Sequence, residues 1–92
     1  ISTIYSRLTM KETKEKIKKF LTQSFGHHEF QEDEDIFSLG FVNSMFAMQL
    51  VLFIEKEFQI TIENEDLEFE NFRSINAMSS FLEKKLAIFA QN

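Results

Sequence analysis

One short stretch of the chain, residues 35–45, combines residue types that could do chemistry. It reads Asp-Ile-Phe-Ser-Leu-Gly-Phe-Val-Asn-Ser-Met, so a glycine and a polar Asn43–Ser44 pair interrupt an apolar run. We expect a helix to begin at this pair, because Asn and Ser are favoured at helix N-termini. Unpaired backbone N–H groups and the helix dipole favour a phosphate at such a position. Ser44 is therefore a candidate phosphate site, with Asn43 beside it and with Gly40 allowing a tight turn.

Other interpretations of these residues are weaker. Ser44 could simply cap the helix, or it could be a hydrolase nucleophile, although no His or acid stands at a recognisable triad spacing from it. His27 and His28 lack further metal ligands at suitable spacing, so we expect exposed loop residues and no metal site. The chain contains no Cys, which excludes a thiolate nucleophile and Cys-based zinc sites.

The acidic run at residues 32–35 could also suggest calcium. An EF-hand loop that started at Asp33 would need a Gly at its sixth position and a Glu at its twelfth. Those positions hold Ser38 and Ser44, so the pattern fails. We expect the run to be a solvated acidic loop.

Three long segments have helical periodicity and would position the candidate site. In the first, residues 10–25, Thr9 and Glu12 fit a capping box and Gly26 is a natural stop. A long connection, residues 27–43, follows it and carries apolar anchors at Ile36, Phe37 and Leu39. The expected second helix, residues 44–58, has a predicted core face that consists of Met48, Val51, Ile54 and Phe58, widened by Met45 and Leu50.

The remaining apolar residues of the second helix, Phe46, Ala47 and Phe53, then point away from that face. After it we expect a short extended segment at residues 60–62 and an acidic loop with one short helical turn at residues 63–72. Ser74 should cap a last helix over residues 75–89, which buries one apolar row (Ile75, Met78, Leu82, Leu86 and Phe89). The predicted fold is all-α, a small four-helix bundle with three long helices and one short one.

Length and charge limit the possible functions. Ninety-two residues suffice for one domain, which we place at residues 10–92, with residues 1–9 as an added or upstream segment. The net charge is -5, and residues 31–72 hold eleven acids against one lysine. This disfavours nucleic-acid binding and favours partners with basic surfaces. Without a membrane-spanning run or a signal pattern, the sequence predicts a cytoplasmic protein.

The stretch at residues 39–45 resembles the attachment motif of acyl and peptidyl carrier proteins, which usually reads Leu-Gly, one or two variable residues, Asp-Ser, and then Leu or Met. The resemblance continues at residues 49–51 and 54–58, and it resumes at residues 72–75, where the family enters its final helix. It covers about residues 11–90. One departure is Asn43, which replaces the usual Asp and can still cap the helix, but without the negative charge.

The resemblance implies a carrier protein and not an enzyme, and it implies a monomer. A magnesium-dependent phosphopantetheinyl transferase would attach a 4'-phosphopantetheine arm from coenzyme A to Ser44, and the arm would hold an acyl group as a thioester. Further partners would be a loading enzyme, tailoring enzymes and an acyltransferase. Residues 40–51 look closest to freestanding carriers of modified malonyl extender units (methoxymalonyl, hydroxymalonyl or aminomalonyl) in polyketide or nonribosomal peptide synthesis.

Two alternatives remain open. The two-residue spacing between Gly40 and Asn43 also occurs in D-alanyl carrier proteins, and a helical interaction module without a prosthetic group would use the same Phe-rich helix. Many fatty-acid carriers have acids where this chain has Phe46, Gln49 and Lys56. We therefore expect partner contact through the apolar surface of the second helix, at Met45, Phe46, Gln49 and Phe53.

Overall fold

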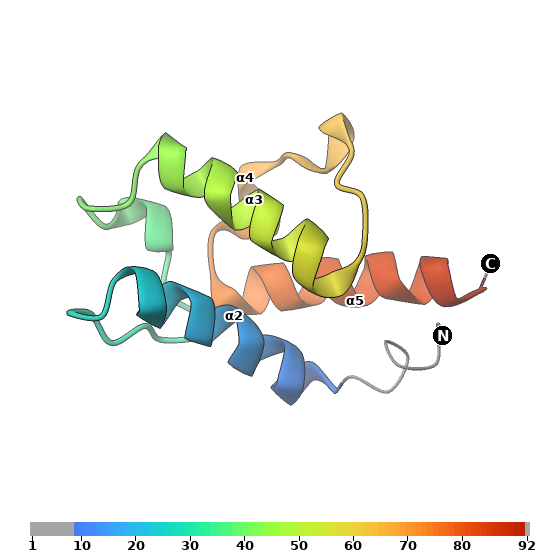
Figure 1. Cartoon of the computed structure of the whole chain (residues 1–92), viewed down its shortest axis with the longest axis horizontal. Coiled ribbons are helices and arrows are strands. Elements are labelled where there is room, and N and C mark those ends of the chain that lie inside the picture. The colour runs from blue at the N-terminus through green and yellow to red at the C-terminus, as the bar shows by residue number, and fades with distance from the viewer. Residues whose placement is uncertain (1–8, 92) are drawn as a thin grey trace.

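Within residues 9–91, four helices of unequal length make up the fold in the computed structural model (Figure 1). The structure describes the backbone of residues 9–91 and the side chains of residues 9–86, so residues 1–8 of the predicted upstream segment and the side chain of Phe89 lie outside it. The three long helices are α2 (Met10–Ser24), α3 (Ser44–Phe58) and α5 (Ile75–Gln91), and α4 (Phe69–Phe72) is short. Two 3-10 turns, η1 (Ile36–Ser38) and η2 (Asn64–Asp66), interrupt the connections. The predicted all-α bundle is confirmed, and no strand occurs among the described residues.

The helices begin where the sequence places their caps. The Glu12 N–H donates to Thr9 Oγ1 at 3.1 Å, and the Thr9 N–H donates to Glu12 Oε1 at 2.9 Å, which completes the predicted capping box. At α5, the Ala77 N–H donates to Ser74 Oγ at 3.0 Å. The helix α3 has the predicted bounds and ends at Gln59, whose φ of 57° is left-handed.

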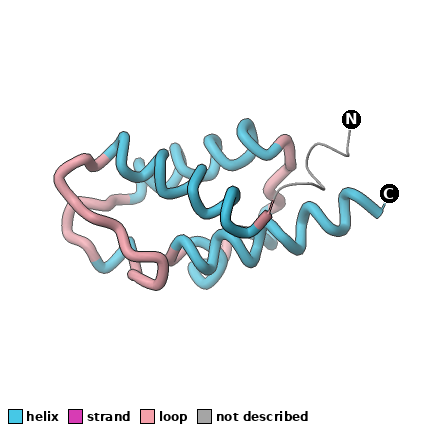
Figure 2. Tube along the Cα trace, turned by 90° about the horizontal axis from the view of Figure 1, so that it is seen from below, coloured by secondary structure: helices cyan, strands magenta, loops and turns pink. Residues whose placement is uncertain are grey.

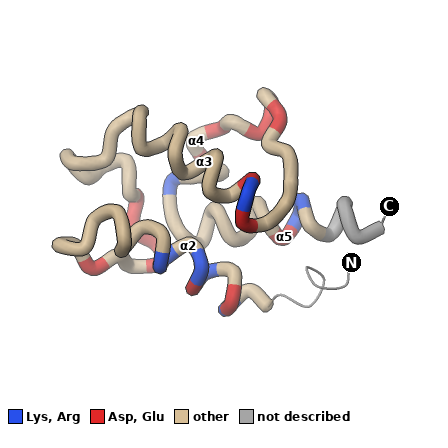
Figure 3. Tube along the Cα trace, in the orientation of Figure 1, with Lys and Arg blue, Asp and Glu red and all other residues tan. Residues whose placement is uncertain are grey.

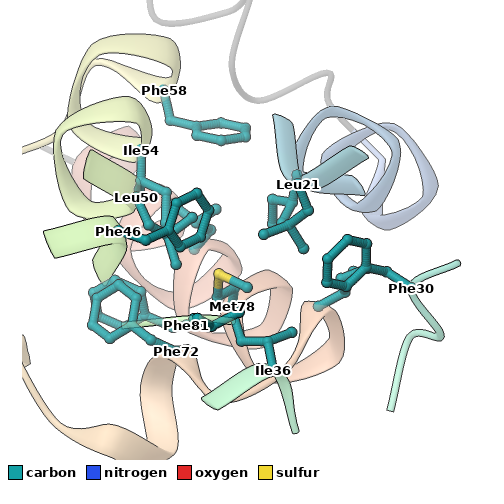
Figure 4. Close-up of a cluster of buried hydrophobic side chains, with 14 residues drawn as sticks. Leu21, Phe30, Ile36, Phe46, Leu50, Ile54, Phe58, Phe72, Met78 and Phe81 are labelled. Carbon is teal, nitrogen blue, oxygen red and sulfur yellow. The ribbon is translucent and has the colours of Figure 1, made fainter. Parts of the chain in front are cut away.

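The core lies between α2, α3 and α5, and its largest side chains are aromatic (Figure 4). The helix α3 contributes a row with a four-residue spacing. This row consists of Phe46, Leu50, Ile54 and Phe58. It faces Leu21 of α2 and Met78 of α5, both of which are fully buried. The backbones of α2 and α4 both lie close to α5, whereas α3 contacts the other helices mainly through long side chains. The buried phenylalanine rings therefore fill the space between α3 and the other helices.

The predicted core face of α3 is therefore wrong in part. Ile54 and Phe58 are buried as expected and Val51 is half-buried, but Met48 is 62% exposed and Met45 is 72% exposed. Phe46, expected to point away from the core, is only 6% exposed. The reason is that α3 is apolar around most of its circumference, so packing decides which row is buried. Ile54 and Phe58 lie on both faces, so the difference is that Phe46 is buried in place of the two methionines. Its ring packs against Phe20 and Phe25 of the α2 region.

The long connection between α2 and α3 is part of the packed structure. Ile36 is buried as predicted and Phe37 and Leu39 pack against the core, while Phe30 and Val42 are additional buried anchors. Two backbone hydrogen bonds fix the connection to the start of α5, from the Ile36 N–H to the Arg73 carbonyl (2.8 Å) and from the Asn76 N–H to the Glu32 carbonyl (2.9 Å). The connection lies at the end of the bundle where α2 ends and α3 begins (Figure 2).

The segment that follows α3 is fixed to α5 by an ion pair. Lys85 Nζ lies 2.7 Å from Asp66 Oδ2, and both side chains are largely shielded from water. The hydrogen bond from Lys85 holds the pKa of Asp66 below its ordinary value, although burial of the carboxylate acts in the opposite direction. A carboxylate with a lowered folded-state pKa stabilises the fold at pH values above its unfolded pKa, and this stabilisation is lost as the pH falls through the folded pKa.

Replacing Lys85 with Met should therefore lower the free energy of unfolding at pH 7 by about 1 kcal/mol, the upper end for a pair of this kind. Urea denaturation should show the difference shrinking as the pH falls below about 3.9, the ordinary pKa of Asp, and disappearing as the pH falls through the lower folded-state pKa, because Asp66 is then protonated in the folded wild type as well. Lys84→Met is the matched control, since Lys84 is an exposed neighbour on the same helix. A deficit that stayed constant between pH 7 and pH 2 would show that Lys85 acts through packing and not through its charge.

Candidate functional site

Ser44 is the first residue of α3, and its side chain is exposed. The helix is capped by the residue before it: the Phe46 N–H donates to Asn43 Oδ1 at 3.0 Å, and the Ala47 N–H donates to the Asn43 carbonyl at 3.1 Å. Asn43 is therefore the N-cap, and the alternative that Ser44 caps the helix is wrong. Within residues 9–86, no group makes a hydrogen bond with Ser44 Oγ. The hydroxyl is left accessible to another molecule.

The surroundings of Ser44 suit a phosphate. The N–H groups of Ser44 and Met45 precede the first hydrogen bond of the helix and have no partner within it. The first turn of α3 contains no acidic residue, so no carboxylate there would repel an anion. These amides and the helix dipole would stabilise a phosphodiester on the Ser44 oxygen. The residues present therefore fit a phosphopantetheine group.

Gly40 lies in the exposed part of the connection, four residues before Ser44. The predicted tight turn is present, since the Val42 N–H donates to the Leu39 carbonyl at 3.1 Å and closes a turn through Gly40. The φ of Gly40 is not positive, and a Cβ added there would meet nothing within 4 Å. The turn therefore forms at Gly40 without requiring a glycine.

A group of aromatic side chains supports the start of α3. The ring centroids of Phe46 and Phe25, at the end of α2, are 4.7 Å apart, and those of Phe25 and Phe41 are 5.0 Å apart. The exposed His27 packs its ring 4.6 Å from Phe41. The Phe20 ring of α2 is stacked with the Phe46 ring, with ring centroids 5.6 Å apart. These ring contacts join α2, α3 and the segment between them. They thereby fix the position of the helical turn that carries Ser44.

The two histidines do not form a catalytic group with Ser44. His27 is exposed, as expected, but His28 is half-buried and its Nε2 lies 3.0 Å from both carboxylate oxygens of Glu34. This contact lowers the pKa of Glu34. The acidic run at residues 32–35 is therefore only partly a solvated loop, since Asp35 also caps η1 through a hydrogen bond from the Phe37 N–H. Among the described residues, no three His, Asp or Glu side chains gather in a way that could hold a metal ion.

Of the four predicted partner-contact residues, two are exposed and two pack within the domain. Met45 and Gln49 are exposed on α3, one and five residues after Ser44. Phe46 is buried and cannot serve as a partner contact in the folded domain. Phe53 is half-buried and stacks on Phe20 with ring centroids 4.2 Å apart.

A groove beside α3 was not predicted from the sequence. It has a volume of about 310 Å³ and lies between α3 and α4. Its lining is almost entirely apolar and consists of Phe37, Ala47, Met48, Leu50, Val51, Leu67, Glu68, Phe69 and Phe72. The signal that could have found it is the pair of apolar residues Leu67 and Phe69 inside an acidic segment, since both remain more than half exposed.

Replacing Asn43 with Ala should destabilise the domain by about 1 kcal/mol, because the first turn of α3 loses its only side-chain cap. Asn43→Asp should keep the cap, and its charge should interact with the helix N-terminus. This protein should therefore be more stable than the wild type by a few tenths of a kcal/mol. Thermal unfolding followed by circular dichroism would measure both changes. If Asn43→Ala melted like the wild type, the hydrogen bond to the Phe46 N–H would have no role in stability.

A comparison with known protein families identifies a match over residues 15–82, well over half of the chain. The matching family is described as phosphopantetheine attachment site. Searches of curated proteins and of solved structures found no significant match. Within the described residues, every helix is too short or too polar to cross a membrane.

Proposed function

Because the chain belongs to the phosphopantetheine-attachment family, and is therefore a carrier that bears a covalent 4'-phosphopantetheine arm and not a catalyst, we propose that Ser44 is the residue that holds this arm. The observation that carries the proposal is the position of Ser44 at the first residue of α3, exposed and without a hydrogen-bond partner in the described chain. The match spans this position. When bound, the arm supplies a thiol that holds an acyl group as a thioester.

The chain's own residues have a passive part in the attachment. The Ser44 oxygen attacks the pyrophosphate of coenzyme A at the phosphorus next to the pantetheine. A new P–O bond forms, the pyrophosphate P–O bond breaks, and 3',5'-ADP leaves. The proton of the hydroxyl must pass to a base of the transferase, because no titratable side chain of the described domain makes a hydrogen bond to Ser44. Asn43 keeps the first turn of α3 formed while this happens.

The experiment is an intact-mass measurement after incubation with coenzyme A, Mg²⁺ and a broad-specificity phosphopantetheinyl transferase. We expect one added phosphopantetheine group per chain, and we expect fragmentation to locate it on Ser44. A protein that gained no mass, although its circular dichroism showed a folded domain, would contradict the proposal. Modification of another serine would contradict the assignment of the site alone.

We further propose that the acyl group is a modified malonyl extender unit. The proposal is supported by the run at residues 40–51, Gly-Phe-Val-Asn-Ser-Met-Phe-Ala-Met-Gln-Leu-Val, which resembles that of freestanding carriers of this type. A D-alanyl carrier is the alternative, since the spacing from Gly40 to Asn43 suits it as well. If the protein carries an extender unit, its partners are an extender-unit loading enzyme, tailoring enzymes and an acyltransferase. These would act in the cytoplasm, which supplies coenzyme A.

The mass of the acyl group on protein isolated from its native cells would distinguish these two substrate classes. A three-carbon diacid with an oxygen or nitrogen substituent is expected. An alanyl group would overturn the extender-unit assignment and leave the arm on Ser44 intact.

A further inference from the structure

Besides the groove between α3 and α4, the surface has a hollow between α2 and α3. This hollow has a volume of about 250 Å³, and we call it the α2–α3 face; it is lined by Lys16, Lys19, Phe20, Gln23, Phe53 and Glu57. The buried row of α3 separates it from the groove, because Val51 and Phe53 flank that row on opposite sides. The two surfaces can therefore be occupied at the same time.

Two stacked phenylalanine rings form the floor of the α2–α3 face. The rings of Phe20 and Phe53 have centroids 4.2 Å apart and an angle of 11° between their planes. Both side chains are only half-buried, whereas the neighbouring ring of Phe58 is completely buried. The uncovered part of the stacked pair offers apolar contact to a side chain from another molecule.

The rim of the α2–α3 face is basic, although the protein as a whole has a net charge of -5. Figure 3 shows basic residues along α2, which holds five lysines against two glutamates, and in the last turn of α3. Lys16 forms an ion pair with Glu57 at 3.0 Å, whereas Lys19 is exposed and forms no ion pair in the part of the chain that the structure describes. Lys56 is also exposed, on the same side of α3 as Phe53 three residues earlier. Positive charge therefore stands beside the aromatic floor.

This combination selects among possible occupants. A partner protein that presents an apolar side chain between Asp or Glu residues would satisfy both the floor and the rim. A second copy of the chain could offer its acidic segment at residues 63–70, but such a contact joins two different surfaces and would continue as a filament. The net charge of -5 on each copy also opposes self-association. The floor and the rim together thus favour a separate, acidic protein.

We propose that the α2–α3 face binds a partner protein through an apolar side chain flanked by acidic residues. Residues 31–72 hold eleven acids against one lysine and favour basic partner surfaces, so one partner surface does not suit both regions. The proposal goes beyond the carrier function, because no residue of this face takes part in the attachment of the arm. A protein bound there leaves Ser44 accessible, so the carrier can be held by one protein while another acts on its acyl group.

The test is an NMR titration of the full-length, ¹⁵N-labelled chain with a short helical peptide that carries one Phe between Glu residues. Two peptides serve as comparisons, one with Ala in place of Phe and one with Arg in place of Glu. We expect the first peptide alone to shift the amides of Lys19, Gln23 and Phe53 and to leave that of Val51 in place. Lys19→Glu should raise the Kd by at least about tenfold. Lys11→Glu is the matched control, because Lys11 is exposed on the same helix, its change alters the net charge equally, and it does not line this face.

Several results would overturn the proposal. These are a failure of the Phe–Glu peptide to bind, equal binding of either comparison peptide, and equal weakening by Lys11→Glu. Shifts at Val51 and not at Phe53 would place the peptide on the other side of α3. Shifts at this face that depend on protein concentration without peptide would make a second copy the occupant. The intact-mass measurement reports on the arm independently, so failure of this face and failure of the attachment site are distinguishable.

Discussion

Changing Ser44 to Ala is expected to abolish phosphopantetheine attachment and to leave the fold intact. The substitution removes the oxygen that would form the new P–O bond, so no residual reaction at this position is possible. Asn43, and not Ser44, caps α3, so the melting temperature should stay close to that of the wild type. Surface substitutions of this kind usually change stability by no more than about 0.5 kcal/mol. Intact mass and circular dichroism would measure the two effects.

Ser80→Ala is the control for this experiment, because Ser80 is also an exposed helical serine but lies on α5. It should be modified as fully as the wild type. A Ser44→Ala protein that still gained the phosphopantetheine mass would show that the arm is attached elsewhere. Loss of modification together with loss of helical signal would show instead that Ser44 has a structural role.

Changing Phe46 to Asp should unfold most of the protein. The truncation of a buried Phe alone costs about 3–5 kcal/mol, and a carboxylate in the same place adds the cost of burying a charge without a partner. The total approaches the whole stability of a small domain, about 5–15 kcal/mol. The helical circular dichroism signal of Phe46→Asp should therefore be largely lost at temperatures where the wild type is folded.

Met45→Asp is the matched control for this second prediction. Met45 is the preceding residue on α3 and is 72% exposed, so the same charge there should leave the domain folded. If Phe46→Asp were as stable as Met45→Asp, the Phe46 side chain would face solvent in solution, as the helical periodicity of the sequence suggested. The aromatic contacts to Phe20 and Phe25 would then not form.

The bounds of α3 were predictable, whereas its buried face was not. Asn43 has a strong preference for the N-cap, and the apolar pattern ends at Phe58, so local chemistry alone locates the helix. Its two candidate rows, one through Met48 and one through Phe46, are both apolar. Periodicity cannot choose between them, because the choice depends on Phe20 and Phe25, which come from α2.

The candidate site shows the same division between local and tertiary information. The position of Ser44 at a helix start follows from neighbouring residues and was predicted correctly. The apolar groove depends on Leu67 and Phe69 approaching Met48 across a connection of irregular structure. The apolar pair in the acidic segment marks an exposed surface, but the sequence does not show which helix that pair approaches. The turn at Gly40 was predicted, but a glycine in a sequence does not reveal whether its backbone angles require that residue.

The aromatic contacts beneath the start of α3 have a consequence for the range of movement of the bound acyl group. Rings from α2, the connection and α3 pack against one another there, and two backbone hydrogen bonds hold the connection to α5. With the arm on Ser44, the attachment point is fixed relative to the domain and only the arm moves. The thioester can then occupy positions around that point, at distances no greater than the length of the arm. An enzyme bound at a fixed place on the carrier would always find the acyl group within the same distance.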